Sequence, residues 1–217
     1  MDLIKTIEEE KIVVIVRGVD REDLIPFAAA MYEGGIRLLE ITYCADGSVS
    51  DAEIAARIQL LKEHFKDTMH IGAGTVLTTD QVERTYAAGG EFIISPDTDR
   101  AVIQKTKELG LISMPGAFTA SEIRAAHTYG ADFVKVFPAV SVGPDYFKAV
   151  KAPLSHIKLL AVGGINQHNM AEYLKAGAAG FGIGGNIVNK QLIKEKNFAA
   201  LTALAREYKA AAGGDEQ

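Results

Sequence analysis

One lysine stands inside an otherwise apolar run of the sequence. Residues 130–140 read GADFVKVFPAV, and Lys135 has valine and phenylalanine on both sides. Burial disfavours a charged ammonium, so the pKa of an amine in such a strand is lowered. A neutral amine attacks carbonyl carbon and forms a Schiff base, whose protonated imine accepts electrons from a breaking carbon–carbon bond. The residue type and its surroundings therefore predict imine chemistry at Lys135.

An acid is expected at the same depth as this lysine. Glu40 stands five residues after Gly35, and Lys135 stands five residues after Gly130. Equal spacing indicates that the two side chains lie equally far along their strands. A carboxylate within reach could move the protons that carbinolamine formation, dehydration and aldol cleavage require. The alternative is an unreactive buried ion pair, which adds little stability because desolvation offsets the attraction.

These residues fall in short β-branched runs that alternate with longer amphipathic runs. The eight candidate strands cover residues 11–16, 37–42, 69–74, 91–95, 111–115, 132–137, 157–162 and 180–184. Strands that alternate with helices form parallel sheets, and eight such units without a long linker predict a (β/α)8 TIM barrel in a single domain over 1–217. An open doubly wound sheet is the alternative. Residues 210–217 are expected to form a frayed tail.

The barrel interpretation brings several of these side chains together. The second and sixth strands have the same parity, so Glu40 and Lys135 are expected to share a layer of inward side chains. Arg17 ends the first strand at the same carboxyl-end mouth, where its charge would lower the pKa of Lys135 further. Thr75 follows the third strand and Pro96 follows the fourth. Active sites of this fold lie at that mouth.

Two glycine pairs follow the last two candidate strands. The sequences AVGGIN at 161–166 and GIGGNI at 182–187 would each supply backbone N–H groups at the start of a helix. Barrels often bind phosphate here through amides and a helix dipole, without basic side chains. The glycines predict a phosphate site, although tight turns would also explain them.

Composition and charge argue against several classes of partner. The net charge of −5 is spread without long single-sign runs, so neither nucleic acid nor an anionic membrane is expected as a partner. No stretch approaches the ~18 apolar residues of a membrane helix, and a signal peptide's basic start is missing. The single cysteine, Cys44, and five scattered histidines offer no metal-ligand spacing. We expect a cytoplasmic enzyme with no metal and no cofactor.

Several motifs together resemble those of the bacterial 2-keto-3-deoxy-6-phosphogluconate (KDPG)/4-hydroxy-2-oxoglutarate (KHG) aldolase family, from Lys11 to the last helix. They are GGIRLLEIT (34–42), GAGTVL (72–77), FIISP (92–96), MPGAFTASE (114–122), VKVFPA (134–139), AVGGIN and GIGGN. The resemblance implies a homotrimer of (β/α)8 barrels. It also implies that Lys135 is the Schiff-base residue and that Glu40 is the acid and base.

The resemblance further implies which residues hold an anionic substrate. Thr75, Pro96 and Phe137 match substrate-contacting positions, and Arg17 matches an active-site arginine of many members. The positions that match the phosphate-binding stretch are Gly163, Gly164, Gly184, Gly185 and Asn186. Asn186 stands where serine is common in the family.

Two positions depart from the commoner pattern of that family. Cys44 stands where many members have an arginine that helps to hold the substrate carboxylate. Val162 stands where many gluconate-type members have threonine, and valine is similar to the 6-phosphogalactonate-type relatives. A catalytic role for the thiol of Cys44 is not expected, because a lone cysteine usually behaves as a small hydrophobe.

The residues and the resemblance predict a lyase of the class I aldolase type. Its expected substrate is a phosphorylated 2-keto-3-deoxy sugar acid, the gluconate or its galactonate epimer, cleaved to pyruvate and glyceraldehyde 3-phosphate. A further candidate is 4-hydroxy-2-oxoglutarate, which would give pyruvate and glyoxylate. Two alternatives stay open, namely a phosphosugar epimerase or isomerase, and a non-catalytic barrel that binds a phosphosugar.

Overall fold

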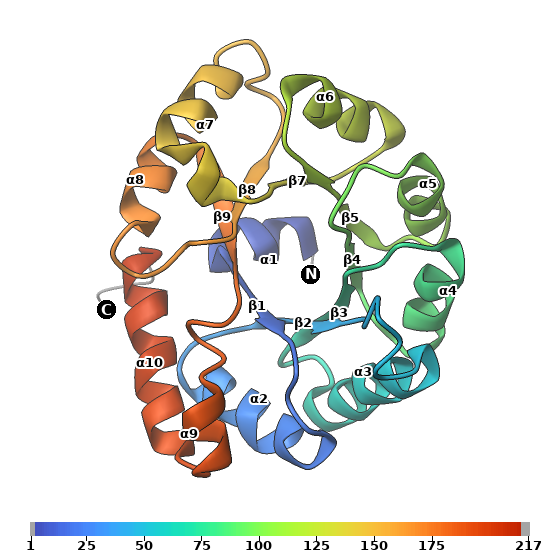
Figure 1. The fold of residues 1–217 in the computed structure, drawn as a ribbon, viewed down its shortest axis with the longest axis vertical. Coiled ribbons are helices and arrows are strands. Elements are labelled where there is room, and N and C mark those ends of the chain that lie inside the picture. Colours follow the sequence, from blue (N-terminus) through green and yellow to red (C-terminus); the bar gives the residue numbers. More distant parts are fainter. Residues whose placement is uncertain (1–2, 214–217) are drawn as a thin grey trace.

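The computed structural model describes residues 3–213 as a ring of strands surrounded by helices (Figure 1). The strands are β1 Ile12–Val16, β2 Leu38–Thr42, β3 His70–Gly74, β4 Phe92–Ile94, β5 Ile112–Met114, β6 Gly116–Ala117, β7 Val134–Val136, β8 Leu159–Val162 and β9 Ala178–Ile183. All paired strands are parallel, in the order β5-β4-β3-β2-β1-β9-β8-β7-β6. The predicted (β/α)8 barrel is thereby confirmed.

The ring closes through a strand that is broken at Pro115. This residue separates β5, which pairs with β4, from β6, which pairs with β7. The carbonyl of Ser113 accepts a hydrogen bond from the N–H of Phe133 at 3.2 Å, and that of Pro115 accepts one from Lys135 at 2.8 Å. Because β5 and β6 form one barrel strand, the structure corresponds to the eight predicted strands and not to an open sheet.

The helices cover the outside of the ring (Figure 1). They are α2 Leu24–Glu33, α3 Asp51–Phe65, α4 Thr79–Ala87, α5 Arg100–Glu108, α6 Ala120–Tyr129, α7 Gly143–Lys151, α8 Met170–Lys175, α9 Lys190–Lys194 and α10 Phe198–Ala211, with 3-10 turns at Arg21–Asp23 and Ala139–Ser141. The side chains that cap a helix start include those of Ser50, Thr78 and Thr119. None of the helices described combines the length and apolar character that crossing a bilayer requires.

The chain ends in a longer helix than the sequence indicated. Helix α10 continues to Ala211 and Ala212 is buried, so the first residues of the expected tail at 210–217 are ordered by packing. The side-chain amine of Lys11 donates to the carbonyl of Ala212 at 3.2 Å, which ties the segment before β1 to the end of α10. Residues 214–217 lie outside the described part.

Buried apolar side chains form two separate layers. One lies between the strands and the outer helices and includes Phe27, Ile58 and Phe147. The other fills the barrel interior and consists of Ile7, Val13, Leu38, Phe92, Ile94, Met114, Phe133, Leu160 and Val162. Helix α1 Leu3–Glu10 closes the amino end of the barrel, where Ile7 is 1% exposed.

Candidate active site

The carboxyl end of the barrel opens into a cavity of about 430 Å³. Glu40 from the middle of β2 and Lys135 from the middle of β7 both line it, although they are only 1% and 8% exposed. The cavity also brings together every other residue that the sequence singled out for substrate: Arg17, Thr75, Pro96, Phe137, Val162, Gly163, Gly164, Gly184, Gly185 and Asn186. Residues from seven parts of the chain thus meet at one place.

Space for the Glu40 carboxylate comes from the neighbouring strand. A Cβ on Gly74 would lie 1.4 Å from the Oε1 atom of Glu40, so a side chain at this position of β3 would displace the acid. Oε1 accepts a hydrogen bond from the hydroxyl of Thr42 at 3.4 Å. The buried Oε2 atom has no hydrogen-bond partner within residues 3–213. One oxygen of the acid is therefore available to a substrate or a water molecule.

Burial shifts the acid and the amine toward their neutral forms. It raises the pKa of Glu40, while the charges of Lys135 and Arg17 and the Thr42 hydrogen bond act in the opposite direction. It also lowers the pKa of Lys135, with Glu40 opposing this shift and Arg17 adding to it. A neutral amine can attack a carbonyl, and a protonated carboxyl can donate a proton.

The mouth of the cavity carries one cation and one aromatic ring. The Nη2 atom of Arg17 donates to the hydroxyl of Thr75 at 2.9 Å. Thr75 has a backbone φ of +54°, which is uncommon for a β-branched residue. The ring centre of Phe137 lies 5.0 Å from the Lys135 amine, and its side chain is 42% exposed. Phe137 therefore forms a wall between the amine and solvent.

The two glycine pairs lie on loops at one side of the cavity. Gly163 and Gly164 have φ of +90° and +76°, and a Cβ on Gly164 would lie 2.5 Å from Val140. Asn169 donates from Nδ2 to the carbonyl of Gly164 at 3.0 Å, which fixes this loop. Asn186 donates to the carbonyl of Ile165 at 3.4 Å, which joins the loop after β9 to the loop after β8.

The helices after these loops begin later than the sequence indicated. Helix α8 begins at Met170 and α9 begins at Lys190, several residues after each glycine pair. The expected helix starts at the glycines are therefore wrong. The left-handed conformations of Gly163 and Gly164 extend the loop after β8, and a turn closed by the N–H of Ile187 on the carbonyl of Gly184 extends the loop after β9. The amides near the cavity belong to turns, which can also form concave anion sites.

Sequence reasoning missed three residues that line the cavity. Ile15 and Gly182 each lie two positions before a residue that was singled out, Arg17 and Gly184. The two-residue alternation of a strand could have identified them. Ile165 lies on a loop and carried no such signal. Cys44 lines a neighbouring cavity of about 410 Å³, which Arg17 also borders.

Comparisons with known proteins agree with this geometry. A family model described as KDPG and KHG aldolase matches residues 3–204. The chain is 33% identical over 213 residues to a probable 2-dehydro-3-deoxy-6-phosphogalactonate aldolase of Rhizobium meliloti (strain 1021), covering 96% of each protein. It is 31% identical over 207 residues to a 2-dehydro-3-deoxy-phosphogluconate aldolase of Treponema pallidum (strain Nichols), covering 94% of this chain and 95% of that protein.

A solved structure is similar over nearly the whole chain. It is a KDPG aldolase from Legionella pneumophila with pyruvate captured at low pH as a covalent carbinolamine intermediate. The two chains are 30% identical and superpose with a TM-score of 0.86, covering 96% of this chain and 98% of that one.

Proposed function

Because the chain belongs to the KDPG and KHG aldolase family, we propose that it cleaves a phosphorylated 2-keto-3-deoxy sugar acid to pyruvate and glyceraldehyde 3-phosphate. Such an enzyme is a carbon–carbon lyase. One observation above all supports the proposal: a buried amine and a buried acid, both shifted toward neutrality, line the same cavity. The relatives are named for the gluconate and for the galactonate, so both epimers are candidate substrates, as is 4-hydroxy-2-oxoglutarate.

The proposed reaction begins at Lys135. Its neutral Nζ attacks the C2 carbonyl to give a carbinolamine. Protonated Glu40 donates a proton to the carbinolamine hydroxyl, which leaves as water, so that a protonated imine and the Glu40 carboxylate remain. Glu40 takes the proton of the C4 hydroxyl, through a water molecule, as the C3–C4 bond breaks and its electrons enter the enamine. The aldehyde leaves. Protonation at C3 and hydrolysis of the imine then release pyruvate and the free amine.

The rest of the cavity binds and orients the substrate in this proposal. Arg17, held by Thr75, pairs with the carboxylate of the keto acid. The phosphate lies at the turn amides of Gly163, Gly164, Gly184, Gly185 and Asn186. Pro96, Phe137 and Val162 form the apolar walls. Their shared lining of one cavity supports these roles.

The other functions that the sequence left open are not favoured. A phosphosugar epimerase or isomerase would not need an imine, and a binding-only barrel would not need a neutral amine beside an acid. We also propose a homotrimer in the cytoplasm. The homotrimer is supported by exposed apolar side chains that follow the strands and lie outside the lining of the cavity, namely those of Leu77, Phe118 and Val140. Light scattering at graded concentrations would measure the mass of the assembly.

The decisive experiment measures pyruvate release from the gluconate, the galactonate and the 4-hydroxy-2-oxoglutarate substrates. Wild-type protein should release pyruvate from at least one of them, and Lys135→Ala from none. Borohydride with pyruvate should add a stable mass to the wild-type protein at Lys135. An adduct on Lys135→Ala, or isotope exchange at a sugar carbon without cleavage, would overturn the proposal.

A further inference from the structure

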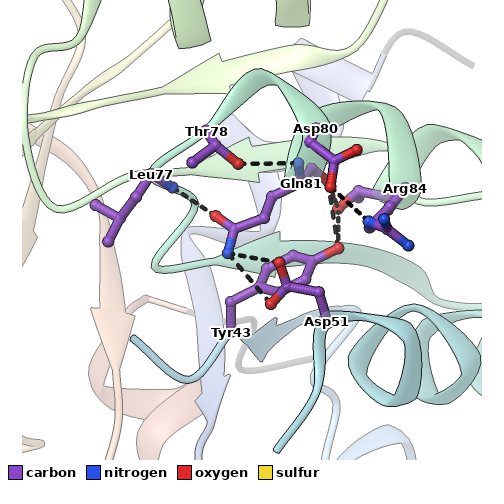
Figure 2. Close-up of polar contacts among 8 residues, drawn as sticks. Tyr43, Asp51, Leu77, Thr78, Asp80, Gln81 and Arg84 are labelled. Carbon is purple, nitrogen blue, oxygen red and sulfur yellow. Dashed lines mark hydrogen bonds and ion pairs between the residues drawn. The ribbon is translucent and has the colours of Figure 1, made fainter. Parts of the chain in front are cut away.

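Gln81 is a buried polar side chain that the proposed reaction does not use. It lies in the first turn of α4, is 8% exposed and has partners on both sides of its amide (Figure 2). Oε1 accepts from the backbone N–H of Leu77 at 2.8 Å, and Nε2 donates to the two carboxylate oxygens of Asp51 at 3.1 and 3.3 Å. A buried amide with both ends bonded holds its partners in fixed relative positions.

The partners of Gln81 belong to segments that follow two strands of the site. Leu77 lies in the loop after β3, whereas Asp51 begins α3 and Tyr43 directly follows β2. The hydroxyl of Tyr43 donates to the backbone carbonyl of Gln81 at 3.2 Å (Figure 2). Gln81 therefore fastens the loop after β3 to the segments that follow β2.

That loop contains Thr75 in its unusual left-handed conformation, with φ of +54°. A β-branched residue keeps this conformation only where its surroundings impose it. The two N–H groups that follow are both bonded. Val76 donates to the carbonyl of Ile94 at 3.2 Å, and Leu77 donates to the Gln81 side chain. Without the second bond, the peptide plane before Leu77 can turn and Thr75 can relax.

Thr75 in turn fixes Arg17 at the mouth of the cavity. The hydroxyl of Thr75 accepts from Nη2 of Arg17 at 2.9 Å, and Arg17 is an exposed residue. A long exposed side chain that is already held loses less conformational freedom when it binds an anion. The chain of contacts therefore runs from Gln81 through Leu77 and Thr75 to the guanidinium of Arg17.

We infer that Gln81 is a positioning residue for recognition of the substrate carboxylate, because its amide holds the loop in which Thr75 orients Arg17. This role rests on the proposed aldolase function. It concerns how tightly the keto acid binds, and it leaves the attack by Lys135 unaffected.

Gln81→Met tests this role, because it removes both side-chain hydrogen bonds and keeps a similar length. KM for the sugar acid should rise about tenfold, as should the pyruvate concentration that half-saturates borohydride trapping. The rate of trapping at saturating pyruvate and kcat should stay within about twofold of wild type. An unchanged KM in folded Gln81→Met would overturn the inference.

Tyr43→Phe is the matched control. It removes a buried hydroxyl from the same network without touching the bond to Leu77. Its Tm should fall while its KM stays at the wild-type value, measured well below the Tm of both variants. A rise in KM for Tyr43→Phe as large as that for Gln81→Met would show a purely structural role.

A double substitution keeps the test decisive if Gln81→Met fails to fold. In Gln81→Glu with Asp51→Asn, the carboxylate still accepts from Leu77 and the new amide donates to it, so KM should return to within about threefold of wild type. Gln81→Glu alone sets two carboxylates together and should keep a raised KM. Failure of the double variant to restore KM would overturn the inference.

A further experiment tests whether Gln81 acts on Arg17 through Thr75. In a Thr75→Val background, where the orientation of Arg17 is already lost, Gln81→Met should raise KM by less than about twofold more. A full additional tenfold rise would overturn the route. Wild-type protein that forms no borohydride adduct with pyruvate would overturn the aldolase function itself. An adduct on wild type combined with a wild-type KM in Gln81→Met would overturn only the role of Gln81.

Discussion

The same strands fill the two ends of the barrel in different ways. Strand β2 contributes Leu38 toward the amino end and Glu40 toward the carboxyl end, whereas Lys135 of β7 lies two residues beyond Phe133. Helix α1 lies across the opening of the ring (Figure 1), and at this amino end its Ile7 completes an apolar cluster with Leu38 and Phe133. At the carboxyl end, Glu40 and Lys135 line an open cavity. On each of these two segments, a shift of two positions leads from a side chain that packs in the apolar cluster to one that lines the candidate active site.

This comparison indicates that the two ends of the barrel determine different properties of the protein, namely stability and activity. Complete burial of a large apolar side chain stabilises a fold by about 1.5–3 kcal/mol. Burial of an amine or an acid acts against folding unless the group is neutral or well paired. Substitutions at the amino end should therefore change the free energy of unfolding, and substitutions at the carboxyl end should change turnover.

The largest expected effect is at Lys135. Lys135→Met should abolish pyruvate release while the Tm stays at or above the wild-type value, because a buried charge-bearing group is replaced by an apolar one. Lys158→Met is the matched control from the amino end, where Lys158 pairs with Glu8 at 3.0 Å and lies near the ring of Phe133. It should keep wild-type kcat and KM. Turnover in folded Lys135→Met would contradict the division between the two ends.

Two glycines of β3 give the next largest effect. In Gly74→Ala the new methyl group displaces the Glu40 carboxylate, so kcat should fall by about 10²-fold with a small change in Tm. In Gly72→Ala the new methyl carbon would lie 2.3 Å from the ring of Phe92 and 2.4 Å from its backbone carbonyl oxygen. Because those atoms cannot move aside, we expect a loss of stability there. Thermal unfolding and steady-state kinetics would distinguish the two, and an opposite pattern would contradict the comparison.

Shortening a side chain of the helix that closes the amino end should change the stability of the protein and leave its kinetics unchanged. Ile7→Ala is expected to lower the free energy of unfolding by about 2–4 kcal/mol, because the buried cluster loses contacts and gains a cavity. Urea unfolding would measure this change. At a temperature well below the Tm, kcat and KM should equal the wild-type values. A kcat reduced tenfold or more would show that the two ends are coupled.

The smallest expected effect is on pH dependence. Burial lowers the pKa of Lys135, so the rate of borohydride trapping with pyruvate should rise with pH and level off below pH 10.5, the ordinary lysine value. Between the folded and the ordinary pKa, the unfolded chain binds the additional proton, so Lys135 makes the fold more stable as pH rises. Replacement of Arg17 by Met should move the trapping profile to higher pH, because a neighbouring cation is removed. A shift to lower pH would contradict this interpretation.

The placement of Glu40 and Lys135 could be predicted because it depends on local regularities. Strand alternation, the parity of the barrel strands and equal spacing from Gly35 and Gly130 are all visible in the sequence. The break at Pro115 was less visible, because a single residue interrupts the ladder without changing the order of the strands.

Features that depend on distant contacts could not be predicted. The late start of α8 follows from the left-handed conformations of Gly163 and Gly164, which fit against Phe137 and Val140. Gln81 stands near the start of an amphipathic helix, where a glutamine is usually exposed. Its burial depends on Asp51, thirty residues earlier in the chain. No local sequence pattern indicates a hydrogen bond between side chains that are so far apart in the chain.

The bond between Lys11 and Ala212 also has a consequence for redesign of the chain. It joins the segment between α1 and β1 to the residue that follows α10, so these two segments are neighbours in space. A linker for circular permutation would then have to span little more than the length of α1, about 12 Å at 1.5 Å per residue. New ends could be opened at Gly110, which lies in an exposed turn before β5 and where an added Cβ would meet nothing within 4 Å. They would lie on the side of the barrel away from the cavity. A partner protein could then be fused to the barrel at these new ends without approaching the cavity.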